Sequence, residues 1–366
     1  MTRSRDLGIP FNGSPGPFNA ITDVAGVEVG YTTLISGGDS MPGSGPAVRT
    51  GVTAILPRGK STGAVFAGWY SFNGCGEMTG TAWIEESGFL ESGIALTSTS
   101  ALGVVYGAMT QWALRSLERQ SIRDIFWFLP VVAETTDFFL SDTAGLHIRP
   151  EHVWAAFDRA ASGPLAEGNV GGGTGMISHD FKGGTGTASR RLAQDEGGYT
   201  LGVLVQANHG AREDLTIAGA PVGLEITDHL PELQAERPEP GSGSIIVIIA
   251  TDAPLLPHQL KRLARRAPLG IGRVGGLGGN TSGDLILAFS TANPVLERGD
   301  DLLQADFLPN SAMNALFRAT VQATEEAIVN ALVSAETMTG VNHSIAYALP
   351  HDRLQAVLKK YKRLRR

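Results

Sequence analysis

The feature that most constrains the fold is a run of apolar residues that begins abruptly in the second half of the chain. The polar segment 238–243, rich in proline and glycine, ends at Ser244, and six apolar residues rich in Val and Ile follow at once over 245–250. A run of this kind between turn residues is typical of a strand that is buried on both faces. We therefore expect this segment to form an interior strand of a layered fold.

Ser244 lies where this predicted strand begins, an unusual position for a hydroxyl group unless the group is used. Gly243 has no side chain to shield its carbonyl group and can adopt backbone conformations that are closed to other residues. The pair is therefore suited to attack by the Ser244 hydroxyl on the peptide bond between them, which would leave Ser244 as a new N-terminus. A plain turn followed by a strand explains the same residues, because Gly-Ser is common turn chemistry.

Composition narrows the class of protein. The chain has 366 residues, of which 42% are hydrophobic, 18% are charged and 47 are glycines, so one large layered domain or two smaller domains are expected. A net charge of −7 indicates neither a nucleic acid nor an anionic membrane as partner, and no apolar run is long enough to span a bilayer. The single cysteine, Cys75, excludes an intrachain disulfide and favours a reducing compartment, so we expect a cytoplasmic protein. The eight histidines form no closely spaced ligand set, so we expect no metal and no cofactor.

Short strands and longer helices alternate along the rest of the chain. Strands or strongly apolar runs are expected over 27–31, 51–56 (closed by 57–59), 64–69, 126–133, 201–207 and 285–290. Helices are expected over 98–117, 150–160, 257–266 (with an exposed basic face), 311–336 and 350–363. The segment 228–243 is the best linker candidate, and the glycine-rich loop 168–176 lacks the Lys-Ser/Thr ending of a phosphate loop. This order of elements predicts helices that cover two central sheets, an α/β/β/α sandwich.

Polar residues at the mouths of the predicted strands are the candidates for chemistry. The loop 275–284 leads into a strand just as the segment before Ser244 does, so two adjacent strands would bring Ser282 and Asp284 near Ser244. Asn208 ends another strand, where its amide either donates to a developing oxyanion or only caps a turn. Glu134 follows the apolar run 126–133, where a carboxylate is costly to bury without a cationic partner. A neighbouring Arg or Lys would be enough to provide that partner.

Several motifs together resemble a known family, the self-processing N-terminal-serine aminopeptidases that include L-aminopeptidase/D-esterase and the β-peptidyl aminopeptidases. The resemblance covers essentially the whole chain, and motifs in a fixed order are far more specific than any single glycine loop. They are AITDVAGVEVG at 20–30, VVAET at 131–135, EGNVGGGTGM at 167–176, VLVQANHG at 203–210, ATDAPL at 250–255, LAFST at 287–291 and SAETMTG at 334–340.

The resemblance implies a precursor that is cleaved between Gly243 and Ser244. The larger subunit would comprise residues 1–243 and the smaller one 244–366, both within one globular domain and assembled as a homotetramer of processed protomers. The implied fold is a four-layer α/β/β/α sandwich that resembles N-terminal-nucleophile hydrolases with a different chain connectivity. The implied substrates are peptides, amides or esters, including D-amino acid derivatives and β-peptides.

The resemblance also assigns roles to single residues. Ser244 would be the nucleophile, and Ser282 and Asp284 match the family's supporting Ser-Gly-acid motif. Asn208 matches the residue that stabilises the oxyanion, and Glu134 matches a glutamate that receives the substrate's amino group. A tyrosine that some members carry shortly after this glutamate is absent, because Thr136 and Phe138 stand there instead.

The chemistry implied by these roles is consistent. A serine hydroxyl needs a base to take its proton, and an N-terminal amine with an ordinary pKa of about 7.7–8.0 is able to serve as one. Two alternatives stay open on the sequence. One is an N-acyl transferase of the ornithine acetyltransferase type, although those enzymes use an N-terminal threonine. The other is a non-catalytic protein that binds a small molecule or nucleotide through its glycine loops.

Overall fold

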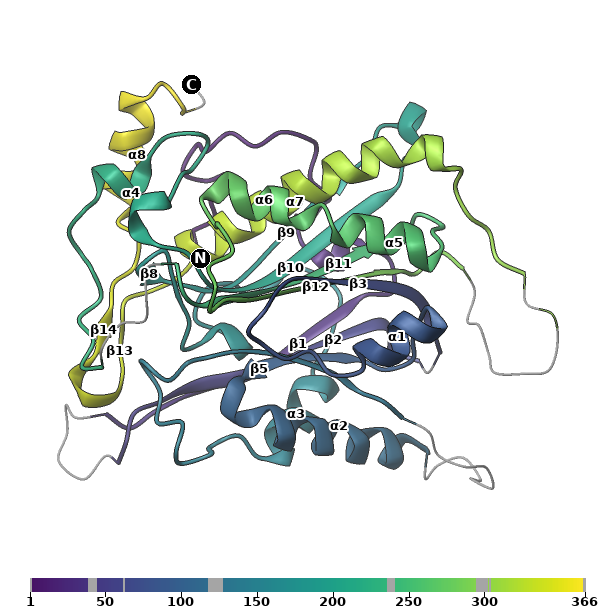
Figure 1. The fold of residues 1–366 in the computed structure, drawn as a ribbon, viewed down its shortest axis with the longest axis horizontal. Helices are drawn as coiled ribbons and strands as arrows, with labels where there is room; N and C mark the ends of the chain where they lie inside the picture. The colour runs from purple at the N-terminus through teal and green to yellow at the C-terminus, as the bar shows by residue number, and fades with distance from the viewer. Residues whose placement is uncertain are drawn as a thin grey trace.

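The computed structural model describes residues 2–38, 45–61, 63–117, 128–235, 241–293, 302 and 304–364. Two β-sheets lie face to face, and helices cover the outer face of each sheet (Figure 1). This arrangement confirms the α/β/β/α sandwich that was predicted from the order of the elements.

The larger sheet has six strands in the order β4-β3-β12-β11-β10-β9. Its two central strands, β11 and β12, are parallel to each other, and all of their residues are buried, which confirms the interior strand expected over 245–250. The other pairings in this sheet are antiparallel. The strands are β3 (Val65–Gly74), β4 (Phe89–Leu90), β9 (Gly184–Arg191), β10 (Thr200–Asn208), β11 (Ser244–Thr251) and β12 (Gly283–Ser290).

The smaller sheet has four strands in the order β1-β2-β5-β6. Its strands are β1 (Glu28–Ser36), β2 (Val48–Lys60), β5 (Ile94–Ser98) and β6 (Val131–Thr135). The expectation that β2 would be closed by residues 57–59 was wrong, since the strand continues to Lys60. Pro57 is tolerated because it lies beyond the last residue pair with β1, Glu28 with Leu56, so its missing N–H leaves no group of β1 unpaired.

Helices α5, α6 and α7 cover the larger sheet, and α2 and α3 cover the smaller one (Figure 1). The helix predicted over 257–266 ends early and is followed at once by a second helix, which the sequence analysis missed although Pro268 marks its first turn. The helices are α1 (Thr81–Ser87), α2 (Leu102–Leu117), α3 (Pro150–Asp158), α4 (Val222–Glu225), α5 (Pro257–Ala264), α6 (Ala267–Val274), α7 (Met313–Val333) and α8 (His351–Lys360). Two short hairpins complete the fold, β7 (Ile177–Ser178) with β8 (Phe181–Lys182) and β13 (Met338–Thr339) with β14 (Ile345–Ala346).

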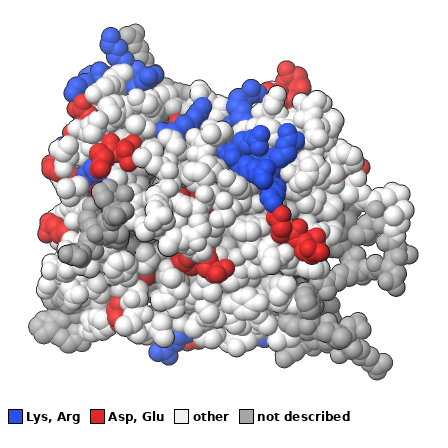
Figure 2. Space-filling model, viewed as in Figure 1, with Lys and Arg blue, Asp and Glu red and all other residues white. Residues whose placement is uncertain are grey.

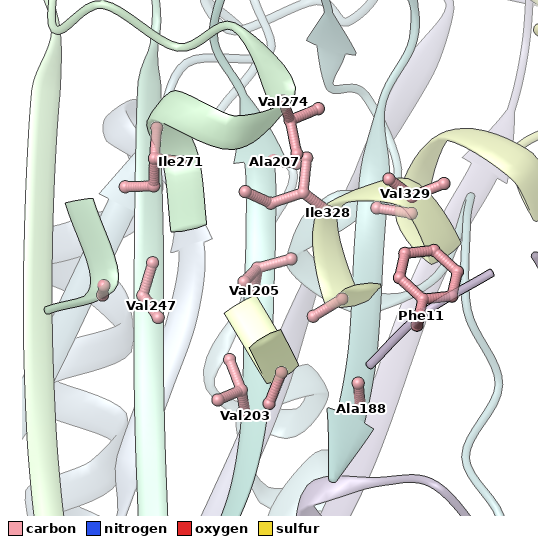
Figure 3. Packing of buried hydrophobic residues seen from close by; sticks show 14 of the residues in the cluster. Phe11, Ala188, Val203, Val205, Ala207, Val247, Ile271, Val274, Ile328 and Val329 are labelled. Atoms are coloured by element: carbon pink, nitrogen blue, oxygen red, sulfur yellow. The ribbon is translucent and has the colours of Figure 1, made fainter. Parts of the chain in front are cut away.

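The core is divided by the larger sheet. Val203, Val205 and Ala207 of β10 point towards Ile328 of α7 and Val274 of α6 (Figure 3), whereas alternate residues of the same strands pack between the two sheets. A side chain at Gly186 of β9 would lie 2.0 Å from the Ala327 carbonyl oxygen, so α7 rests directly on the sheet through its buried row of alanines.

The basic face predicted on the helix over 257–266 is present (Figure 2), where Lys and Arg side chains gather over α5. Much of this charge is engaged within the protein. Lys261 forms an ion pair with Glu85 of α1, and Arg262 and Arg266 stack on Phe317 of α7.

The predicted linker over 228–243 is only partly described, since residues 236–240, including the stretch from Pro238 to Pro240, lie outside the described residues, as do residues 126 and 127 of the apolar run before Glu134. The beginning of the linker is anchored rather than loose. The buried Arg212 guanidinium donates to the carbonyl oxygens of Asp228 and His229, and Glu232 pairs with Ile345 of β14. Among the described residues, no helix is long and apolar enough to cross a membrane.

Candidate active site

The parallel pairing of β11 and β12 places the first candidate residues together. Ser244 opens β11 and lies opposite Gly283 at the start of β12. The Gly283 amide donates a hydrogen bond of 3.0 Å to the Ser244 Oγ, so the hydroxyl oxygen is held at the mouth of both strands. The structure therefore brings Ser244, Ser282 and Asp284 to one edge of the sheet, as expected from the two similar strand mouths.

Ser282 and Asp284 form a buried pair beside this serine. The Ser282 hydroxyl donates to Asp284 Oδ1 at 2.6 Å, and the same oxygen accepts the Ile245 amide at 3.2 Å. Burial raises the pKa of the Asp284 carboxyl, and the two hydrogen bonds act in the opposite direction. The carboxyl group is thus tied to the amide of the residue that directly follows Ser244.

Gly243 has a conformation that a side chain would not permit. Its φ of +129° lies in the region that favours glycine, and an added Cβ would be 2.1 Å from the Asn208 carbonyl oxygen. The bond between Gly243 and Ser244 therefore passes directly against the end of β10.

Asn208 faces Ser244 across the antiparallel pair β10–β11. Its Oδ1 accepts a hydrogen bond of 2.9 Å from the Ile177 amide. Because a backbone N–H only donates, the carboxamide must turn its oxygen towards Ile177, which directs its NH₂ group away from that contact. Asn208 also lines the same cavity as Ser244, so this NH₂ group is a candidate donor to a reacting carbonyl oxygen.

Glu134 is buried within β6, and the donors to its carboxylate are neutral. The Glu77 amide donates to Oε1 at 2.9 Å, and the Thr99 hydroxyl donates to Oε2. Within the part of the chain that the structure describes, no Lys, Arg or His forms an ion pair with it. The neighbouring basic residue that would make this carboxylate merely structural is therefore not found there, and the carboxylate faces the cavity.

The cavity shared by these groups has a volume of about 1060 Å³, at the upper end of the range for small-molecule sites. Ser244, Asn208 and Glu134 all line it. Apolar side chains line the cavity as well, among them Phe138, and Thr136 is also part of its wall. The other apolar side chains in the wall are Phe139, Ile177, Leu224, Leu230 and Leu233.

Two contributions to the site were not anticipated from the sequence. Thr99 binds Glu134 from the turn that precedes α2, and Ile177 fixes Asn208 from the hairpin β7–β8. The only signal for Thr99 was its place at the start of the helix predicted over 98–117. A backbone amide such as that of Ile177 leaves no signal in the sequence. The described residues include no cluster of metal-ligand type.

Most of the chain matches a known protein family. Residues 19–346 match Peptidase family S58. The beta-peptidyl aminopeptidase BapA of Sphingosinicella microcystinivorans is 54% identical, over 99% of this chain and 93% of its own. The protein of the same name from Sphingosinicella xenopeptidilytica is 51% identical, over 98% of this chain and 91% of its own.

Solved structures give a similar picture. The L-aminopeptidase D-Ala-esterase/amidase from Ochrobactrum anthropi, a variant of the Ntn hydrolase fold, superimposes with a TM-score of 0.92 at 48% identity, covering 100% of both chains. A Burkholderia sp. beta-aminopeptidase superimposes with a TM-score of 0.87 at 45% identity, covering 98% of this chain and 99% of its own. The fold is therefore that of the Ntn-hydrolase variant.

Proposed function

The chain belongs to peptidase family S58 and is an aminopeptidase, and from this premise we propose that Ser244 is its nucleophile and is released by cleavage of the Gly243–Ser244 bond. The observation that carries the proposal is the single cavity lined by Ser244, Asn208 and Glu134, with Ser282 and Asp284 directly behind the serine. Membership of a peptidase family also sets aside the acyl transferase and the non-catalytic binding protein as alternatives.

In the processing step, the Ser244 hydroxyl attacks the Gly243 carbonyl carbon, and the bond to the Ser244 nitrogen breaks. The resulting ester is hydrolysed by water, which leaves a carboxylate on Gly243 and an amine on Ser244. The products are fragments of residues 1–243 and 244–366, which stay in one domain. The arrangement supports this view, because β11 and β12 of the smaller fragment lie between β3 and β10 of the larger one.

In the peptidase reaction, the new amine takes the proton of the Ser244 hydroxyl while Oγ attacks the substrate's first carbonyl carbon. The Asn208 amide donates to the oxyanion that develops, and Ser282 with Asp284 orients the amine and hydroxyl of Ser244. The amine leaving group departs with a proton, and water then hydrolyses the acyl-enzyme. The Ser244 side chain is thus restored at the end of each cycle.

Glu134 restricts this chemistry to the first residue of a chain. Its buried carboxylate has only neutral donors, so a substrate ammonium would supply the charge that the described residues do not. A substrate with a blocked N-terminus brings no such charge. This argument supports removal of N-terminal residues rather than internal cleavage.

The range of substrates is proposed from the relatives. N-terminal β-amino acid residues are the first candidate, because two relatives more than half identical to this chain are named as beta-peptidyl aminopeptidases. L-residues and D-alanine amides or esters are the second, because the solved Ochrobactrum anthropi enzyme carries that name at 48% identity. The large cavity leaves room for the extra backbone carbon of a β-residue.

Assembly and location complete the proposal. We infer a homotetramer of processed protomers from the family resemblance, to be tested by light scattering of purified protein. A cytoplasmic location is supported by the single cysteine, Cys75, and is to be tested by cell fractionation.

The experiment that tests the nucleophile is intact-mass analysis of purified wild-type protein beside Ser244→Ala. Wild type should give fragments of 243 and 123 residues, the smaller beginning with Ser-Ile-Ile, and the variant should stay a single inactive chain. An active, uncleaved wild-type chain would contradict the proposal.

A further inference from the structure

One peptide group links the proposed oxyanion donor to a buried lysine. The N–H of the Met176–Ile177 peptide donates to Asn208 Oδ1 at 2.9 Å. The C=O of the same peptide accepts a hydrogen bond of 2.8 Å from the Lys182 ammonium. The peptide group therefore has Lys182 on one side and Asn208 on the other.

Lys182 occupies an unusual environment for a cation. Its side chain is fully buried and donates hydrogen bonds to the carbonyl oxygens of Met176, Gly183 and Gly173, at 2.8, 2.9 and 3.4 Å. Burial lowers the pKa of its ammonium group to about 7. Lysine is almost never fully buried without a paired charge, so a side chain with no task beyond filling space would be apolar here.

The hairpin β7–β8 holds both ends of this chain of hydrogen bonds in place. Its turn residues, His179 and Asp180, have φ of +47° and +59°, the pattern that a tight two-residue hairpin turn requires. The His179 amide donates to the His209 carbonyl oxygen at 2.8 Å, which fastens the hairpin to the residue next to Asn208. At the other end of the hairpin, Lys182 of β8 pairs with Ile177 of β7.

We propose that Lys182 is a positioning residue that acts on the oxyanion through two amide groups in series, an inference that rests on the proposed role of Asn208. The hydrogen bond that the Lys182 Nζ donates draws electron density towards the Met176 carbonyl oxygen, so the Ile177 N–H becomes a stronger donor. Asn208 Oδ1 accepts that stronger bond, and its NH₂ group in turn becomes a stronger and better oriented donor to the oxyanion. Hydrogen bonds in a chain polarise one another in this way, most of all where water is excluded.

The test is a double-mutant cycle of Lys182→Met and Asn208→Ala, read as kcat and KM on a free-amine amino acid p-nitroanilide. Rates are expressed per processed chain, counted by intact mass after incubation until the smaller fragment has formed. Asn208→Ala should lower kcat by roughly 10²- to 10³-fold, as loss of an oxyanion donor does. Lys182→Met should lower kcat by roughly three- to thirtyfold with KM almost unchanged, because the lost interaction is made in the transition state.

The double variant decides between positioning and mere structure. If Lys182 acts through Asn208, adding Lys182→Met to Asn208→Ala should change kcat by no more than about twofold. Effects that multiply in the double variant would overturn the inference, and so would a wild-type kcat in Lys182→Met beside an impaired Asn208→Ala. A wild-type kcat in Asn208→Ala would instead remove the oxyanion role proposed above, and this inference with it.

Two controls keep the result interpretable. Asn330→Ala removes another fully buried side chain that binds backbone, in this case the Thr187 carbonyl oxygen, and should lower the melting temperature without changing kcat. If Lys182→Met does not give soluble protein, Lys182→Gln takes its place in the cycle. Its amide keeps donors at this position but carries no charge, so the same non-additivity is expected.

Discussion

Two buried carboxylates in this protein have opposite surroundings. Glu326 of α7 has a side chain with no exposed surface and is bound by Arg5 and Arg190, at 2.6 and 2.7 Å. Glu134 of β6 is also buried, but the donors to it in the described chain are the Glu77 amide and the Thr99 hydroxyl. Glu326 is thus bound by cations of the protein itself, whereas the described donors to Glu134 are neutral, as the proposed binding of a substrate ammonium requires.

The largest effect should be on stability, when the Glu326 carboxylate that binds Arg5 and Arg190 is removed. Burial alone would raise the pKa of Glu326, but the hydrogen bond from Arg5 and the charges of Arg190 and Arg5 outweigh it and hold the pKa low. Glu326→Gln leaves buried arginine charge uncompensated, so the free energy of unfolding should fall by about 3–5 kcal/mol. Chemical denaturation measures this change, while kcat per processed chain should stay at the wild-type level.

The adjacent Glu325 is the matched control for this variant. It pairs with Arg273 at 2.9 Å on the surface, so Glu325→Gln should cost at most about 1 kcal/mol. Equal stability of the two variants would show that the arginines around Glu326 are not a buried clamp. The pH dependence has a definite sign as well. Because the pKa of Glu326 is lowered in the folded state, its contribution is present at neutral pH and is lost as pH falls through that folded-state pKa.

The second prediction concerns the carboxylate that faces the cavity. Glu134→Gln should lower kcat/KM for free-amine substrates by roughly ten- to a hundredfold, the loss of about 1.5–3 kcal/mol for a charge-assisted hydrogen bond. Cleavage at Gly243–Ser244 should continue, and the free energy of unfolding should stay the same or rise, in contrast to Glu326→Gln. Rates on a free-amine peptide and on its N-acetylated form, with wild type and variant side by side, measure the effect. If wild type cleaves both forms equally well, Glu134 is structural and the exopeptidase assignment fails.

A third carboxylate extends the comparison. Asp284 resembles Glu134 in having neutral donors, Ser282 and the Ile245 amide, but it lies behind Ser244, the proposed nucleophile. Asp284→Asn should lower kcat/KM roughly tenfold even in protein that is already processed, because Ser282 and the Ser244 amine lose their orienting acceptor. In wild type, kcat/KM should rise with pH through an apparent pKa near or below the ordinary amine value of about 7.7–8.0. An unchanged rate in processed Asp284→Asn would remove Asp284 from the mechanism.

The smallest effect should be on the pH dependence of stability and should come from two buried histidines, His179 and His209, near Asn208. Burial lowers the pKa of His179 to about 4 and holds the pKa of His209 well below its usual range. The unfolded chain therefore takes up protons from about pH 6.5 downward while the folded chain does not, so these residues reduce stability as pH falls. His209→Gln should remove on the order of 1 kcal/mol of this loss per pH unit between pH 6.5 and 5, measured by denaturation at each pH. Parallel curves for wild type and variant would contradict the prediction.

The sequence predicted the parts of the fold that depend on local pattern. The apolar run after Ser244 identified the central strand, and the similar loop before Asp284 identified its neighbour, because strand burial and turn chemistry are written in consecutive residues. Two local exceptions were missed, the continuation of β2 through Pro57 and the helix that starts at Ala267. The strand can continue because Pro57 lies beyond the last residue pair with β1, and the helix had a local signal, Pro268 in its first turn, that was not used.

Residues of the proposed site were recognised from the sequence where their side chains line the cavity, and not where the proposed action runs through the backbone. Ser244, Asn208 and Glu134 were recognised at strand mouths, and the structure places them around one cavity. Lys182 was not recognised, because Phe-Lys-Gly-Gly is an ordinary surface-type sequence. Its burial depends on carbonyl groups that a separate glycine-rich loop, 168–176, brings to it only in the folded chain.

The place of β11 and β12 in the middle of the larger sheet has a consequence for the life of the enzyme. If the chain is cut before Ser244 as proposed, β11 and β12 of the smaller piece lie between β3 and β10 of the larger one, and Arg5 of the larger piece forms an ion pair with Glu326 of the smaller. The two segments then fold together only once, while they are still joined in the precursor. The intact chain keeps each segment at a high effective concentration near the other. A denatured mature enzyme has lost that connection. Its refolding becomes an association of two separate fragments, so the yield should depend on protein concentration. The yield of the uncut Ser244→Ala chain should not.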